Sequence, residues 1–143
     1  MKKLSLAGIF VCILCILAIS IGTTGAFTRK SSEKKPHPML MKLESTNQDY
    51  VRLLGGPPET ASMRSGLVSL APGKSVGKHS TENYEEMVIV LHGTGDLQIG
   101  GGDTLHLAQG YASYCPSHTV HDVLNTGSDT LRYIYIVAST NLK

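Results

Sequence analysis

Five histidines lie between residues 50 and 143 of this 143-residue chain, and they are its most promising chemical groups. Three of them, His79, His118 and His121, occupy two stretches in which Gly, Pro and Glu recur at regular intervals. Imidazole nitrogens together with a carboxylate suit iron, manganese, nickel, copper or zinc. No Ser-His-Asp triad, phosphate-binding loop or CxxC pair can be assembled from the spacing of the other residues in this region. The residue types therefore indicate metal chemistry.

The order and spacing of these residues resemble the paired motifs of the cupin superfamily. Eight of the ten fixed motif positions agree: Gly73, His79, Glu86 and Gly93 in the first stretch, and Gly110, Pro116, His121 and Asn125 in the second. The resemblance covers about residues 64–138 and implies a double-sheet jelly roll.

By this resemblance His79, Glu86 and His121 would be the ligands of one divalent transition metal: Fe, Mn, Zn, Ni or Cu. Elementary physics supports the grouping. Glu86 opens an apolar strand, and a charged carboxylate inside a small barrel is costly unless a cation compensates it. His121 follows a Pro-containing turn and arrives from a distant segment.

Two residues depart from the motif pattern. Thr81 stands where the family usually has a second His, and side-chain alternation in a strand would point it the same way as His79. His118 stands where the motif has Gly. Thr81 is expected to hydrogen-bond a metal-bound water, and His118 is a candidate to replace the lost ligand nitrogen.

Two functions are compatible with this pattern. In one, the three ligands leave open coordination positions, as in non-haem oxygenases, and the protein acts as a dioxygenase-like or isomerase-like enzyme on a small polar or carbonyl-bearing molecule. In the other, the missing ligand marks a non-catalytic module that binds a small ligand with weak metal or none. One fold hosts many functions, so the fold does not choose between them.

The elements that would position these residues are short strands separated by Gly, Pro and Asn turns. About eight apolar or alternating segments recur at intervals of roughly ten residues, which is typical of an all-β sandwich or barrel. Met87 to Leu91 form an unbroken apolar run that predicts a strand buried on both sides. The expected strands cover residues 50–54, 66–71, 86–92, 96–99, 104–107, 111–115, 120–124 and 131–137.

Several residues beside the motifs have structural roles by default. His92 and His106 are expected at the surface, and Tyr84, Tyr111 and Tyr114 in the core or at the barrel mouth. Cys115 is the only thiol between residues 50 and 143, so no disulfide can form within that part. We expect it to be buried and inert.

The N-terminal residues have the composition of a targeting segment. Lys2 and Lys3 precede an uncharged run over residues 4–21, and small residues follow up to residue 26. Residues 1–26 are therefore a signal peptide or an N-terminal hydrophobic anchor helix, residues 27–49 a linker and residues 50–143 the cupin domain. An extracytoplasmic protein is expected, secreted or held at the membrane by residues 4–21.

The charge of the remaining chain restricts its partners. Residues 43–143 contain six basic and ten acidic residues, which offers no basic face for phosphates and argues against nucleic-acid binding. The expected partners are a small-molecule ligand or substrate and a second copy in a homodimer, since cupin-like barrels often pair through edge strands.

Overall fold

The computed structural model describes residues 35–43 and 48–141, and in these residues it contains nine strands and no helix. No helix in this part is long and apolar enough to cross a bilayer. The expected signal or anchor segment, residues 1–26, lies outside the described residues. The strands are β1 Tyr50–Gly55, β2 Arg64–Leu70, β3 His79–Ser80, β4 Tyr84–His92, β5 Thr94–Ile99, β6 Thr104–Ala108, β7 Ala112–Cys115, β8 Val120–Leu124 and β9 Leu131–Ser139.

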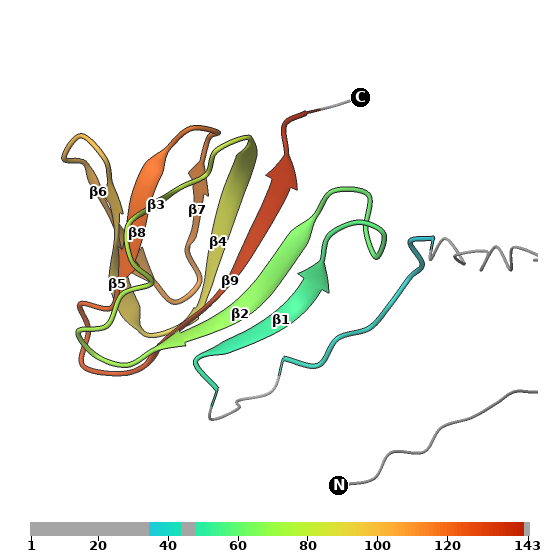
Figure 1. The fold of residues 1–143 in the computed structure, drawn as a ribbon. Helices are drawn as coiled ribbons and strands as arrows, with labels where there is room; N and C mark the ends of the chain where they lie inside the picture. Colours follow the sequence, from blue (N-terminus) through green and yellow to red (C-terminus); the bar gives the residue numbers. More distant parts are fainter. Residues whose placement is uncertain (1–34, 44–47, 142–143) are drawn as a thin grey trace, which may run out of the picture. The chain divides into compact units, whose positions relative to one another are not determined.

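The strands form two antiparallel sheets that face each other (Figure 1). The larger sheet has the order β1-β2-β9-β4-β7, and the smaller has the order β3-β8-β5-β6. Because β4 pairs with β7 in the larger sheet and β3 pairs with β8 in the smaller, segments carrying the two motifs come together. This arrangement confirms the predicted all-β class and its jelly-roll character.

Each of the eight predicted strands is present, with ends within two residues of those expected. The additional strand is β3, which consists only of His79 and Ser80 and pairs with β8. Two residues are too few to show an alternating pattern, so pairing with a distant strand, and not local sequence, creates this element.

The core lies between the sheets and is aliphatic. Val88, Val90, Leu97, Val123 and Leu131 are each at most 2% exposed, and they come from both sheets. Burial of one such side chain contributes about 1.5–3 kcal/mol. Glu86 and His121 are thus held on strands, β4 and β8, that line a closely packed core.

The apolar run of β4 is buried on one face only, which corrects the prediction of burial on both. Val88 and Val90 face the core, whereas Met87 is 42% exposed and Ile89 and Leu91 are half-buried. In the part of the chain that the structure describes, no further layer covers this outer face. Unbroken hydrophobicity therefore does not distinguish a strand covered on both faces from one with an apolar outer face.

Two of the motif residues, Gly93 and Asn125, have structural roles in turns. Gly93 has φ of 80°, and a Cβ there would lie 2.7 Å from the carbonyl oxygen of Thr130. The Asn125 amide, 1% exposed, donates to the carbonyls of Leu70 and Asp129 and accepts from the Gly127 N–H. These contacts fix the turns that follow β4 and β8.

Candidate metal centre

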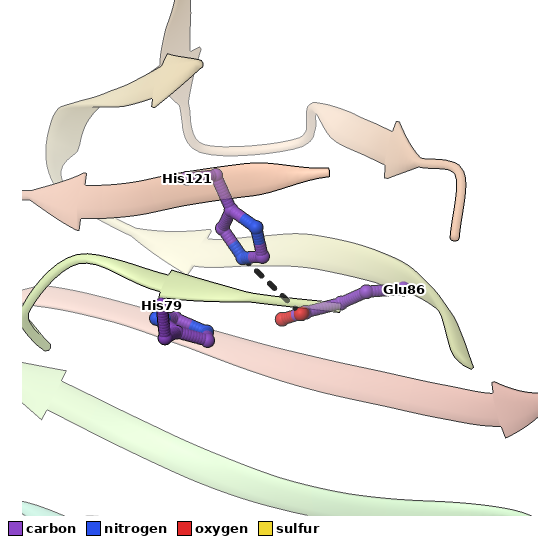
Figure 2. Close-up of side chains that lie close together, drawn as sticks. All are labelled: His79, Glu86 and His121. Carbon is purple, nitrogen blue, oxygen red and sulfur yellow. Dashed lines mark ion pairs between the residues drawn. The ribbon is translucent and has the colours of Figure 1, made fainter. Parts of the chain in front are cut away.

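Three strands carry the three candidate ligands. His79 begins β3 and His121 lies in β8, and the two are direct partners in the antiparallel ladder between these strands. Glu86 lies in β4 of the opposite sheet, on the same face as core residues Val88 and Val90. Figure 2 shows the His121 ring and the Glu86 carboxylate pointing toward each other, with His79 beside them. The fold thus brings residues of both motifs to one point between the sheets.

The distances within this group are those of a compact ligand set. One ligand atom from each residue lies within 4.8 Å of the others. The two imidazole rings have centroids 4.3 Å apart with an interplanar angle of 56°. Two donors bound to one ion at about 2.1 Å lie at most about 4.2 Å apart, so binding requires a contraction of a few tenths of an ångström. His79 is exposed and can rotate to provide it.

Backbone carbonyls determine which nitrogen each histidine presents. The Nδ1 of His79 lies 2.8 Å from the carbonyl oxygen of Gly77, and the Nδ1 of His121 lies 3.2 Å from that of Thr119. A carbonyl only accepts hydrogen bonds, so each Nδ1 carries a proton and donates it. In the neutral rings, each Nε2 therefore has a free lone pair, which is the arrangement that metal-binding histidines adopt.

The Nε2 of His121 has an unusual environment. The His121 side chain is fully buried and its Nε2 lies 3.2 Å from a carboxylate oxygen of Glu86, yet this nitrogen has no hydrogen-bond partner. The nearby Glu86 carboxylate raises the pKa of His121 above its usual value, against the effect of burial. A lone pair directed at a buried carboxylate is repulsive, so the site favours either a proton or a metal cation between them. The residues present thus fit a divalent ion.

Thr81 is buried, but its hydroxyl is directed at the backbone. It donates to the carbonyl of Pro116 at 2.8 Å and accepts from the N–H of Thr119 at 2.8 Å. Because the single hydroxyl proton is used, Thr81 cannot donate to a metal-bound water as expected. It instead anchors the turn whose Thr119 carbonyl orients His121.

His118 is not brought to the ligand group. Its side chain is exposed, and the His/Glu/His cluster forms without it. Its φ is 59°, in the left-handed region that favours glycine, which explains why the motif has Gly at this position. The structure therefore does not support a substitute-ligand role for His118.

The other two histidines lie at the surface, as expected. His92 is exposed at the end of β4. The imidazole of His106 is 85% exposed and lies 2.7 Å from the Asp96 carboxylate.

A cavity of about 440 Å³ adjoins the ligand group. Tyr84 lines it, together with three tyrosines that sequence reasoning did not single out: Tyr50, Tyr133 and Tyr135. Tyr133 and Tyr135 could have been predicted to face the interior, because they alternate with Arg132, Ile134 and Ile136 along β9. Burial raises the pKa values of these two phenols well above the usual value, so they are neutral. Tyr111 and Tyr114, expected in the core or at the mouth, are instead 62% and 54% exposed.

Cys115 lies in β7 opposite Glu86 and is 2% exposed. Burial, followed by the negative charge of Glu86, raises the pKa of its thiol. It is a free thiol, and it is not among the three residues of the ligand cluster. The expected burial is confirmed.

Comparison with known families decides the classification. The model of a family described as the Cupin domain matches residues 66–137, about half of the chain and nearly all of the two sheets. The chain belongs to the cupin superfamily. This cupin has no match among curated proteins.

Solved structures share the fold. A protein from Bacillus halodurans aligns with a TM-score of 0.64 and 22% identity over 78% of this chain and 88% of that one. A Thermotoga maritima protein described as a predicted oxalate decarboxylase aligns with a TM-score of 0.58 and 25% identity. The alignment covers 63% of this chain and 78% of that one. The cupin domain of Cnp3 from Schizosaccharomyces pombe aligns with a TM-score of 0.57 and 17% identity over 63% of each chain, slightly less than two thirds of its length.

Proposed function

We propose that this cupin binds one divalent transition metal, Fe, Mn, Zn, Ni or Cu, through His79, Glu86 and His121, and presents it to a small molecule in the adjoining cavity. The observation that carries the proposal is the buried Nε2 of His121. It has no hydrogen-bond partner and faces the Glu86 carboxylate, with a second imidazole close by. A cation at this point would remove the cost of the buried carboxylate.

The three ligands would leave coordination positions open toward the cavity, where a bound metal would supply Lewis-acid or oxygen-activating chemistry. The chain would contribute the position and the charge of the ligands. His121 is held rigidly, Glu86 supplies the negative charge, and the carbonyls of Gly77 and Thr119 orient the rings. As an enzyme, the protein would be a dioxygenase-like or isomerase-like catalyst on a small polar or carbonyl-bearing molecule.

A non-catalytic ligand-binding module is the second candidate. The cavity is lined mainly by residues outside the ligand group, so it would retain a small molecule with weak metal or none. The use of the Thr81 hydroxyl by the backbone favours this candidate, because only three side-chain ligands remain.

Metal analysis of the purified protein distinguishes these functions. For the metallo-cupin we expect about one equivalent of divalent metal, lost in His121→Ala and retained in the matched surface variant His106→Ala. A folded protein without metal, which also takes up none on titration, would contradict metal binding and favour the simple module. Assignment as an enzyme would further require substrate turnover that depends on the bound metal.

Location and assembly are also proposals. We propose an extracytoplasmic protein whose residues 1–26 are a cleaved signal or whose residues 4–21 anchor it to the membrane. Mass spectrometry of the mature protein tests this, since a start at Phe27 indicates cleavage. A chain beginning at Met1 or Lys2 indicates an anchor.

We propose a homodimer as well, supported by the apolar outer face of the larger sheet around Met87 and Ile136. Light scattering should give twice the monomer mass, and Met87→Glu should reduce it to one. A monomeric mass for the unaltered chain would contradict the dimer.

A further inference from the structure

We propose that the cavity beside the three ligands takes a mainly apolar molecule with one oxygen-bearing end and no more than one negative charge, and that it excludes small dicarboxylates. This inference rests on the proposed function of the same site and names its ligand class. It separates this protein from the activity suggested by the name of its Thermotoga maritima neighbour.

The composition of the wall is the first observation. In the part of the chain that the structure describes, no Lys or Arg lines this cavity, and Glu86 is its only acidic residue. Four valines and four tyrosines make up eight of its twelve lining residues. Apolar walls with few polar groups are typical of sites that bury the body of an organic ligand.

Two cationic side chains, Arg64 and Lys78, line neighbouring hollows and not this cavity. The Arg64 guanidinium lies over the Tyr84 ring, 5.3 Å from its centroid, and lines a neighbouring hollow with Pro57 and Ser139. Lys78 lines a separate polar hollow with Asp103 and Asp122. Recognition of a dicarboxylate ordinarily uses such cations in direct contact with its oxygens, which this wall does not offer.

Charge balance at the proposed site leads to the same conclusion. Two neutral imidazoles, one carboxylate and one divalent ion together carry one net positive charge. When a neutral oxygen donor binds, the net charge of the site stays at +1. When a donor with one negative charge binds, the net charge becomes zero. A dianion would leave the site with one uncompensated negative charge beside the buried Glu86 carboxylate, which is costly where the charged groups are partly desolvated.

Two adjacent aromatic rings contribute to the lining of the cavity. The rings of Tyr50 and Tyr135 stack with centroids 6.3 Å apart and an interplanar angle of 17°, and their hydroxyls lie 3.0 Å apart. Gly66 permits this approach, because a Cβ there would lie 2.6 Å from the Tyr50 ring and 2.7 Å from the Tyr135 ring. A planar ligand body can pack against such a surface by aromatic contact.

Three small probes test the ligand class by calorimetry or by NMR shift titration of the full-length protein, with Zn²⁺ and without it. The first probe, 2′-hydroxyacetophenone, is neutral and has an aromatic ring with two adjacent oxygen groups. Phthalate keeps the aromatic ring but has two carboxylates. Oxalate has two carboxylates and no ring. We expect the neutral probe to bind at least about tenfold more tightly than either dianion, as the loss of a charged hydrogen-bond partner predicts. Equal or tighter binding of phthalate or oxalate would overturn the proposal.

Two variants locate the effect in this cavity. Val76 is 42% exposed, so Val76→Arg should fold and should strengthen dianion binding about tenfold by adding the missing cation. Tyr50 is 49% exposed, and Tyr50→Ala should weaken the neutral probe, whereas the matched variant Tyr111→Ala, outside the cavity, should not. Unchanged affinities in Val76→Arg and Tyr50→Ala would contradict this location of the site.

The metal-free arm separates this inference from the proposed function. If the protein takes up no Zn²⁺ but still prefers the neutral probe, metal binding fails and the ligand class stands. If Zn²⁺ binds and the neutral probe does not, the ligand class fails and the metal site stands.

Discussion

His79 and His121 are paired residues on adjacent antiparallel strands, yet His79 is exposed and His121 is 1% exposed. Both rings donate through Nδ1 to a carbonyl two residues earlier in the chain. The buried ring is fixed by packing, whereas the ring at the sheet edge can adjust. The candidate ligand group therefore combines one fixed imidazole with one adjustable imidazole.

Replacing Glu86 by Gln should separate charge from shape. Loss of a residue that merely supports a metal ligand lowers metal affinity about 10- to 100-fold. The loss in Glu86→Gln should be larger, because the site loses its only negatively charged ligand. At pH 8 the metal-free variant should be at least as stable as the parent, since a buried unpaired carboxylate is removed. Competition with a chromophoric chelator and thermal unfolding measure the two effects. Unchanged affinity would show that Glu86 is not a ligand.

The pH dependence follows from the pKa of His121, which the nearby Glu86 carboxylate raises. The folded state therefore binds this proton more tightly than the unfolded state, in which the pKa is about 6.5. The resulting stability is fully present below pH 6.5 and is lost as pH rises through the raised value. Metal competes with the same proton, so metal affinity should increase over that interval. Unfolding and metal titrations at several pH values test both trends, and Glu86→Gln should weaken them.

Thr81→Val should destabilise the protein by about 1–3 kcal/mol, because the Pro116 carbonyl and the Thr119 N–H both lose their partner. Metal affinity should also fall, since the turn carrying the Thr119 carbonyl that orients His121 is then held by the Thr81 backbone N–H alone and no longer by the hydroxyl as well. Thr81→Ser retains the hydroxyl and should restore both properties. Denaturant unfolding and metal titration of the two variants provide the comparison. If Thr81→Val binds metal normally, the hydroxyl serves stability alone.

His118→Gly should leave metal stoichiometry unchanged, because the imidazole is exposed and lies outside the ligand cluster. Stability should rise by up to about 1 kcal/mol, since glycine adopts the φ of 59° without the strain of a side chain. Metal analysis and thermal unfolding are sufficient to check this. Loss of metal from the variant would restore His118 as a fourth ligand.

Cys115 should react slowly with iodoacetamide in the folded protein. Burial and the charge of Glu86 raise the pKa of the thiol, and the thiolate is the reactive form. Mass spectrometry of the Cys115 peptide should show at least about tenfold faster labelling in denaturant than in buffer at pH 8. Equal rates would indicate that the thiol is accessible.

The sequence was sufficient to predict eight of the nine described strands and to select three residues that the fold brings together. Alternation in β9 and the turns after β4 and β8 are local signals, and the spacing around His79, Glu86 and His121 matches a family pattern. The convergence of these three side chains follows from the sheet order, because β4 and β8 belong to different sheets. Their role as metal ligands stays a prediction.

Other features depend on long-range contacts that a pattern does not contain. Strand β3 exists because His79 pairs with His121, and the Thr81 hydroxyl is directed away from solvent because the Pro116 turn passes beside it. Tyr50, Tyr133 and Tyr135 line one cavity because β1, β2 and β9 lie side by side in the larger sheet. Exposure of Met87 depends on what covers a sheet face, which apolar composition alone does not specify.

Glu86 lies on an interior strand with neighbours on both sides, so its carboxylate cannot withdraw into solvent when the site holds no cation. A ligand at 100 times its dissociation constant stabilises a folded protein by about 2.7 kcal/mol. The availability of the metal would then determine the lifetime of the protein. Chains without metal would unfold more often and be degraded sooner. The amount of the protein would therefore follow the metal concentration even if its rate of synthesis were constant.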